Sequence, residues 1–176
     1  MKKLTALCLL TLSLNCFAVK KKHEHREHSA HEHGAGQLAI AFDLNKGKIE
    51  FRTAAESILG FEYKAKTKKD IKTLEDTVSY FEKNMNQLIQ LESSLNCQFS
   101  KEKIGQMPEG DEKDVINHSD WIASFDVTCA KSPVGTKLTI DFSHFKKIHD
   151  LDITILVDSI QKSAEFKGKA VSVELR

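Results

Sequence analysis

A single amphipathic helical segment stands between runs that alternate like β-strands, and this order constrains the fold more than any other feature. Residues 67–95 place apolar side chains at spacings of three and four, which predicts one long amphipathic helix. Thr67 followed by Asp70 is typical of a capping box at the helix start, and Asn96 is expected to end the helix. The apolar stripe consists of Ile71, Leu74, Val78, Phe81, Met85 and Leu88.

Apolar residues that alternate with a period of two predict strands on both sides of this helix. Before the helix, residues 38–44 and 49–53 flank a turn at 45–47, which predicts a hairpin. After the helix, the alternating runs are 121–129, 138–142, 151–157 and 171–175. Strands, one helix and further strands indicate an α+β fold with a mainly antiparallel sheet.

The first 18 residues have the composition of a secretory signal peptide. Lys2 and Lys3 are followed by uncharged residues 4–17 and by the small residue Ala18. Cleavage is expected after Ala18, which would place the mature chain in the periplasm. A membrane anchor would need about 20 apolar residues, so no membrane span is expected in the mature chain.

A lipid-anchored form through Cys16 is the less favoured alternative. The preceding residues, Leu14 and Asn15, are not the small residues that such a site requires. The signal segment contains two of the 26 basic residues and none of the 25 acidic ones, so the exported chain has a net charge of about −1. This balance, without basic residues interleaved with aromatic ones, argues against nucleic acid as a partner.

Two cysteines, Cys97 and Cys129, remain after removal of the signal segment. An even pair in an oxidising compartment predicts a disulfide bond. Cys129 shares the parity of Trp121 and Phe125, so its sulfur is expected to face the core. A two-thiolate metal site is the alternative, but no second cysteine lies near either one.

Residues 19–36 form a polar arm that contains five of the eight histidines. Neutral imidazole is a good ligand for zinc, copper and nickel, and carboxylates complete or orient the ligand shell. Histidines two or three residues apart bring their rings to one side of an extended or helical chain. We therefore expect a flexible metal-binding arm, followed by a single α+β domain over residues 37–176. The histidines are His23, His25, His28, His31 and His33, interleaved with Glu24, Glu27 and Glu32, of which Glu32 is a weaker candidate ligand.

A second group of candidate ligands lies near an acidic loop expected at residues 105–120. His118 follows several acids and precedes Asp120, so these two side chains could join a metal site. A solvated loop without a ligand is an equally good interpretation. The remaining candidates are interpreted as surface residues: His144 and His149, which flank two lysines, and Glu56 and Glu62, which flank a turn near Gly60.

Signatures of catalysis are missing from the sequence. It contains no glycine-rich phosphate loop, no His-Glu-x-x-His and no nucleophile elbow. The chain is therefore expected to be a binding protein and not an enzyme. Two alternatives stay open: an envelope protein whose domain binds a partner, and a metal-dependent hydrolase, which would need three protein ligands around an open position.

In several segments the chain resembles the ZrgA-type periplasmic proteins. The resemblance rests on His31-Glu32-His33-Gly34, on Leu59-Gly60-Phe61-Glu62, and on the order of Cys97, the strand ending at Cys129 and the closing strands. It implies a zinc-regulated protein that binds zinc (Zn²⁺) through histidine-rich segments, His31 and His33 above all. It also implies a role in zinc import beside a solute-binding protein and its transporter.

The chain departs from this family pattern at two places. The family commonly has a longer His- and Asp-rich insert between the two cysteines, whereas here the region is short and His118 is its only histidine. Tyr63 also stands where the family often has histidine. The number of bound ions and the presence of a second site therefore stay open. The ligand chemistry alone also allows copper or nickel, and only the resemblance favours zinc.

Overall fold

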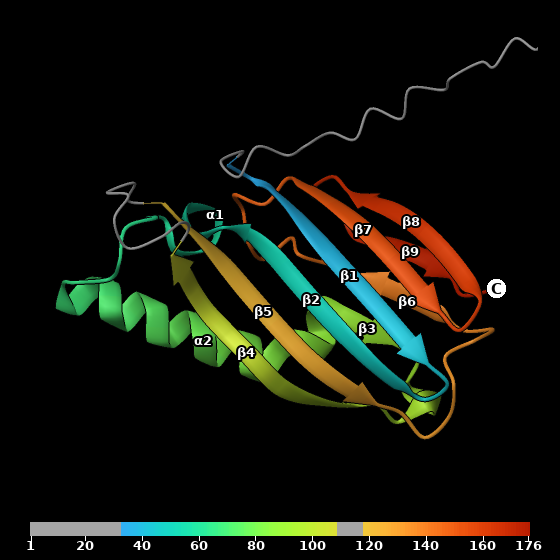
Figure 1. Ribbon diagram of the computed structural model, residues 1–176. Coiled ribbons are helices and arrows are strands. Elements are labelled where there is room, and N and C mark those ends of the chain that lie inside the picture. The colour runs from blue at the N-terminus through green and yellow to red at the C-terminus, as the bar shows by residue number, and fades with distance from the viewer. Residues whose placement is uncertain (1–32, 109–117) are drawn as a thin grey trace, which may run out of the picture.

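A six-stranded sheet forms the larger layer of the protein (Figure 1). The computed structural model describes residues 33–108 and 118–176. The strand order is β4-β5-β2-β1-β7-β8; among these described strands, β1 and β7 pair in parallel, and the other neighbours are antiparallel. The predicted α+β class with a mainly antiparallel sheet is confirmed. The strands are β1 (Ala35–Asp43), β2 (Lys46–Ala54), β4 (Gln98–Pro108), β5 (Ser119–Thr128), β7 (Asp150–Val157) and β8 (Ile160–Phe166).

The second layer consists of helix α2 (Lys68–Leu88) and a three-stranded sheet, which lie on one face of the large sheet (Figure 1). The small sheet has the order β3 (Ile89–Leu91), β6 (Lys137–Ile140), β9 (Val171–Glu174). Aromatic side chains fill the space between the layers: the rings of Phe51 and Phe142 are 4.7 Å apart, and those of Phe81 and Trp121 are 5.4 Å apart. Burial of each such side chain contributes about 1.5–3 kcal/mol.

Helix α2 begins as the sequence predicts and ends earlier. Thr67 and Asp70 form the capping box, and the hydrogen bond from Thr67 lowers the pKa of the Asp70 carboxyl. The expected end near residue 95 is wrong, because Ile89 leaves the helix and pairs with Ile140 of β6. The apolar residues after Leu88 belong to strand β3 (Ile89–Leu91) and to a short 3₁₀ turn, η1 (Ser93–Leu95). Sheet pairing therefore overrides the helical spacing there.

Besides β3 and η1, three elements were not predicted: β4, β8 and the short helix α1 (Ala55–Leu59). The alternation in β4 is interrupted by a register shift between Lys101 and Lys103, which hides its period of two. Part of the expected acidic loop, residues 105–108, belongs to this strand. Residues 119–120 of the expected loop belong to β5, and residues 109–117 lie outside the described residues, as do the signal segment and the arm up to residue 32.

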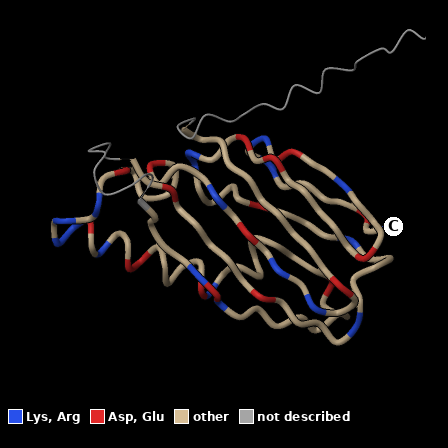
Figure 2. The backbone as a smooth tube through the Cα atoms, viewed as in Figure 1, with Lys and Arg blue, Asp and Glu red and all other residues tan. Residues whose placement is uncertain are grey.

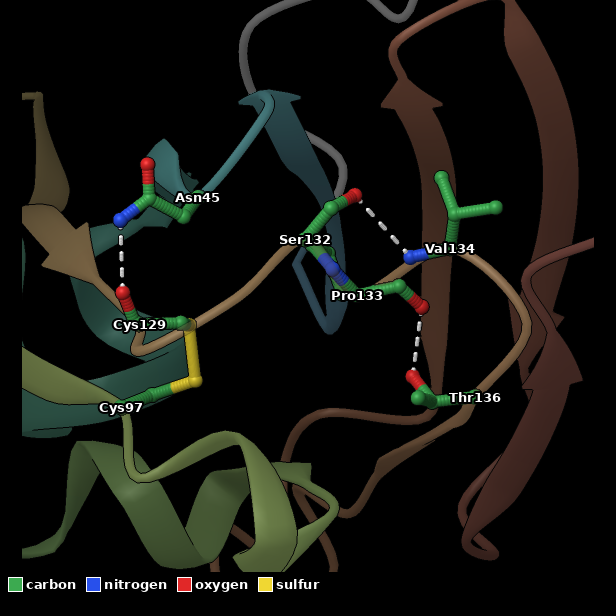
Figure 3. Close-up of a disulfide and its surroundings, with 7 residues drawn as sticks. All are labelled: Asn45, Cys97, Cys129, Ser132, Pro133, Val134 and Thr136. Carbon is green, nitrogen blue, oxygen red and sulfur yellow. Dashed lines mark hydrogen bonds between the residues drawn. A yellow bond between two sulfur atoms is a disulfide. The ribbon is translucent and has the colours of Figure 1, made fainter.

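The predicted disulfide between Cys97 and Cys129 is present (Figure 3). Cys129 is buried with Trp121 and Phe125, which confirms the face predicted for its sulfur. The backbone of Cys129 also exchanges hydrogen bonds with Asn45, whose carbonyl accepts at 2.9 Å and whose side-chain amide donates at 2.8 Å. The disulfide thus joins the start of β4 to the end of β5, and the Asn45 hydrogen bonds fix the same point to the turn between β1 and β2.

Acidic and basic residues are interspersed over the described part of the chain (Figure 2). Several form pairs between strands, such as Lys48 with Glu102 and Arg52 with Asp120. Within residues 33–108 and 118–176, no helix is both long and apolar enough to cross a membrane.

Candidate metal site

Strand pairing brings four separate parts of the chain to one end of the large sheet. β1 and β2 are antiparallel, with Gly36 opposite Thr53, so the start of β1 lies beside the end of β2. The antiparallel pairing of Ala54 with Asp120 places the start of β5 there as well. The parallel pairing of β1 with β7 adds the residues before Asp150. His33, helix α1 and its following turn, His118 and the segment before β7 therefore meet.

Glu62 lies between two histidines at this end of the sheet. Its Oε1 is 2.9 Å from Nε2 of His33, and its Oε2 is hydrogen bonded to Nδ1 of His118. The Glu62 side chain is only 11% exposed, against 53% for His33 and 40% for His118. We call these three residues the His-Glu-His cluster. The interpretation of Glu62 as an exposed surface acid is wrong, because β1 and β5 both deliver a histidine to it.

The contacts of Glu62 determine which nitrogen of each ring carries the lone pair. An ionised carboxylate only accepts hydrogen bonds, so a neutral His118 donates from Nδ1, and a neutral His33 has its N–H on Nε2, the nitrogen that faces the carboxylate at 2.9 Å. The lone pair of His33 is then on Nδ1 and that of His118 on Nε2. Histidines that bind a metal in proteins commonly donate their other N–H to a carboxylate, which orients the ring. Glu62 makes that hydrogen bond with His118 and lies against Nε2 of His33.

Glu56, on helix α1, adds an oxygen beside the lone-pair nitrogen of His33. Its Oε2 is 3.8 Å from Nδ1 of His33, while its Oε1 accepts from Nζ of Lys147. Two ligands of one tetrahedral zinc ion lie roughly 3.3 Å apart when each is about 2.0 Å from the metal. A small movement of Glu56 would therefore allow it and His33 to bind the same ion. The ion pair with Glu56 also offsets the positive charge of Lys147.

Backbone hydrogen bonds of Gly34 hold the chain in place directly after His33. Its N–H donates to Oγ of the buried Ser57 at 2.8 Å, and its carbonyl accepts from the N–H of His149 at 3.0 Å. Its φ is +84°, and a Cβ atom there would lie 2.3 Å from Nε2 of His149. A residue without a side chain is thus required immediately after His33.

Asp120 and His144 make contacts with residues outside the cluster. Asp120 is close in sequence to His118, but its carboxylate accepts from the guanidinium of Arg52, with Nε at 2.8 Å. His144 stacks on Tyr80, with ring centroids 4.2 Å apart. The remaining ligand candidates in the arm lie outside the described residues; they are His23, His25, His28, His31 and Glu32.

No group of three or more His, Cys, Asp or Glu side chains in residues 33–108 and 118–176 is arranged to enclose a metal ion. The cluster is consistent with this observation, because Glu62 stands between the two imidazoles. The two lone-pair nitrogens lie on the sides of the rings away from Glu62. Sequence patterns missed Glu62 because its role depends on contacts between distant segments, although Gly60-Phe61-Glu62 is part of the motif that carries the family resemblance.

Comparison with known proteins gives one family match. The family model described as ZrgA family zinc uptake protein matches residues 30–175. The matched range includes both histidines of the cluster, both glutamates and the disulfide. A search of curated proteins finds no match to the chain.

Proposed function

Because the chain belongs to the ZrgA family of zinc uptake proteins, we propose that it is an exported periplasmic protein that captures zinc and assists its import. The His-Glu-His cluster is the observation that carries this proposal. One carboxylate, only 11% exposed, is hydrogen bonded to the imidazole of His118 and lies 2.9 Å from that of His33, which is how a carboxylate orients metal-binding histidines. Zinc is the cargo that the family description implies.

The described residues and the arm would supply complementary ligands. His33 and His118 are fixed by Glu62, and Glu56 offers an oxygen near His33. The arm adds His31 two residues before His33, with three further histidines upstream. Because Cys97 and Cys129 are joined in a disulfide, the two cysteines of the exported chain supply no thiolate, and the site takes nitrogen and oxygen ligands.

Replacing the arm histidines is expected to lower the number of zinc ions bound per chain and to weaken the binding that remains. The four-alanine variant, with His23, His25, His28 and His31 changed to alanine in the exported chain, keeps the cluster but loses the ligands that complete its shell. Calorimetric titration with zinc, copper and nickel would measure both stoichiometry and selectivity. An exported chain with His144→Ala is the matched control, since His144 lies in neither the arm nor the cluster and stacks on Tyr80. Unchanged zinc stoichiometry in the four-alanine variant would exclude the arm as a binding segment.

Zinc affinity is expected to fall as the pH drops through the ordinary histidine range near 6.5. Protons compete with zinc for the imidazole nitrogens, so binding should be strong above this range and weak below it. Titrations between about pH 5 and 8 in buffers that do not bind zinc would measure the slope. An affinity that stays constant over this interval would contradict histidine as the main ligand type.

A binding role fits the cluster better than a catalytic one. A zinc hydrolase needs three ligands that face one open position, whereas Glu62 lies between its two imidazoles. We therefore propose that the protein holds zinc and passes it to an importer or to the importer's solute-binding protein. Hydrolysis of activated esters by the zinc-loaded chain, lost in His118→Ala, would favour the hydrolase instead.

A further inference from the structure

The segment that carries Glu62 belongs to neither a helix nor a strand. Residues 61–67 connect α1 to α2, so the position of Glu62 is not set by the hydrogen bonds of a regular element. Gly60, with φ +85°, ends α1 and turns the chain toward β4 and β5. The carbonyl groups of this segment need partners from elsewhere in the protein.

Gln106 of β4 supplies a partner to two of these carbonyls. Its Nε2 donates to the carbonyl oxygen of Glu62 at 3.0 Å and to that of Tyr63 at 2.9 Å, and it lies 2.7 Å from Oγ of Ser119. The hydroxyl of Ser119, at the start of β5, donates to the same Glu62 carbonyl. Ser119 is buried and directly follows His118. Two adjacent strands therefore hold the Glu62 backbone at the position where its side chain meets both histidines.

We propose that Gln106 and Ser119 are positioning residues of the zinc site, which set its affinity by holding Glu62 between His33 and His118. The proposal rests on the proposed function, because it concerns the zinc affinity of the same cluster. Neither residue is a ligand. Gln106, on β4, contacts the backbone carbonyls of Glu62 and Tyr63. Its effect on zinc affinity should therefore pass entirely through the position of the Glu62 carboxylate.

The chemistry of Gln106 restricts what can replace it. Its amide nitrogen donates to two carbonyls, and a glutamate of the same shape would have only acceptors to offer them. Methionine has a similar length and no donor. Loss of the donors leaves the Glu62 and Tyr63 carbonyls with fewer partners and allows the segment to move away from His118.

The test is a zinc titration of Gln106→Met in the four-alanine variant, which isolates the cluster from the arm. Changes in the outer shell of a metal site typically cost 10- to 100-fold in affinity, and we expect roughly a tenfold loss here. Gln98→Met is the matched control: it lies on the same strand, is exposed, and is at the other end of the sheet. The visible spectrum of bound Co²⁺, which depends on coordination geometry, should change in Gln106→Met and not in Gln98→Met.

A double-mutant cycle with Glu62→Gln separates positioning from general stability. If Gln106 acts through Glu62, Gln106→Met should cause no further loss of affinity when Glu62 is already changed. The same tenfold loss in both backgrounds would overturn the proposal, and so would a wild-type affinity in Gln106→Met.

Ser119 gives an independent measurement, because Ser119→Thr keeps the hydroxyl and Ser119→Ala removes it. We expect weakened zinc binding in the alanine variant and restoration in the threonine variant; equal affinities in Ser119→Ala and the parent chain would contradict a positioning role.

If Glu62→Gln and His118→Ala also bind zinc like the parent chain, the proposed function itself fails. If these two weaken binding and the Gln106 and Ser119 variants do not, only the positioning proposal fails.

Discussion

Replacing Glu62 by glutamine is expected to weaken zinc binding roughly 10- to 100-fold, the usual cost of removing a carboxylate that orients metal-binding histidines. The carboxylate is hydrogen bonded to Nδ1 of His118 and lies 2.9 Å from Nε2 of His33. A glutamine can accept from one ring through its oxygen, but its nitrogen would donate toward the other ring. That ring must then rotate or change its tautomer, and its second nitrogen no longer faces the metal.

Competition titration with a zinc indicator in the four-alanine variant would measure this loss. Glu50→Gln is a suitable control, because Glu50 is an exposed glutamate of β2, several residues away from the cluster end of the sheet. It removes the same charge from the chain without touching either histidine. Equal losses in both variants would show that net charge, and not the hydrogen bonds of Glu62, determines the affinity.

The second large effect concerns stability. Changing Cys97 and Cys129 to alanine is expected to lower the free energy of unfolding by roughly 3–4 kcal/mol, because the bond closes a loop with a sequence separation of 32 residues and so restricts the unfolded chain. The melting temperature should fall by roughly 10 °C for a chain of this size. Thermal and denaturant unfolding of the metal-free exported chain would measure both quantities.

Reducing agent supplies the internal control for this experiment. It should destabilise the parent chain and leave the double-alanine variant unchanged. Zinc affinity at 25 °C should be the same in both, since the disulfide adjoins the β1–β2 turn and the cluster lies at the other end of those strands, roughly 30 Å away at about 3.3 Å per residue. A stability that does not respond to loss of the bond would contradict the structural role.

The sequence predicts most strands of this fold because one face of each is buried. In β5, Trp121, Ala123, Phe125 and Val127 alternate and are all buried, so the pattern and the structure agree. The alternation of apolar and polar residues is weaker in the edge strands. β4 and β8 each have a neighbour on only one side within the six-stranded sheet and carry many polar side chains. Their period is therefore hard to detect.

The candidate site was predictable only in its residue types. His33 and His118 stand out in the sequence because histidines among acids are typical of metal sites. Their connection through Glu62 depends on how β1, β2 and β5 pair, which no local pattern contains. The same tertiary pairing explains why Asp120, two residues from His118, contacts Arg52 across the strands instead.

The parallel pairing of β1 with β7 also determines how late the sheet beside His33 is completed. β1 lies in the middle of the sheet, between β2, which follows it at once, and β7, which begins at Asp150. Pairing between segments so distant in the chain is slow, because the entropy of closing the intervening loop opposes it. His33 precedes β1, and His118 precedes β5. On the proposed function, the cluster binds zinc only after folding has brought His33, Glu62 and His118 together.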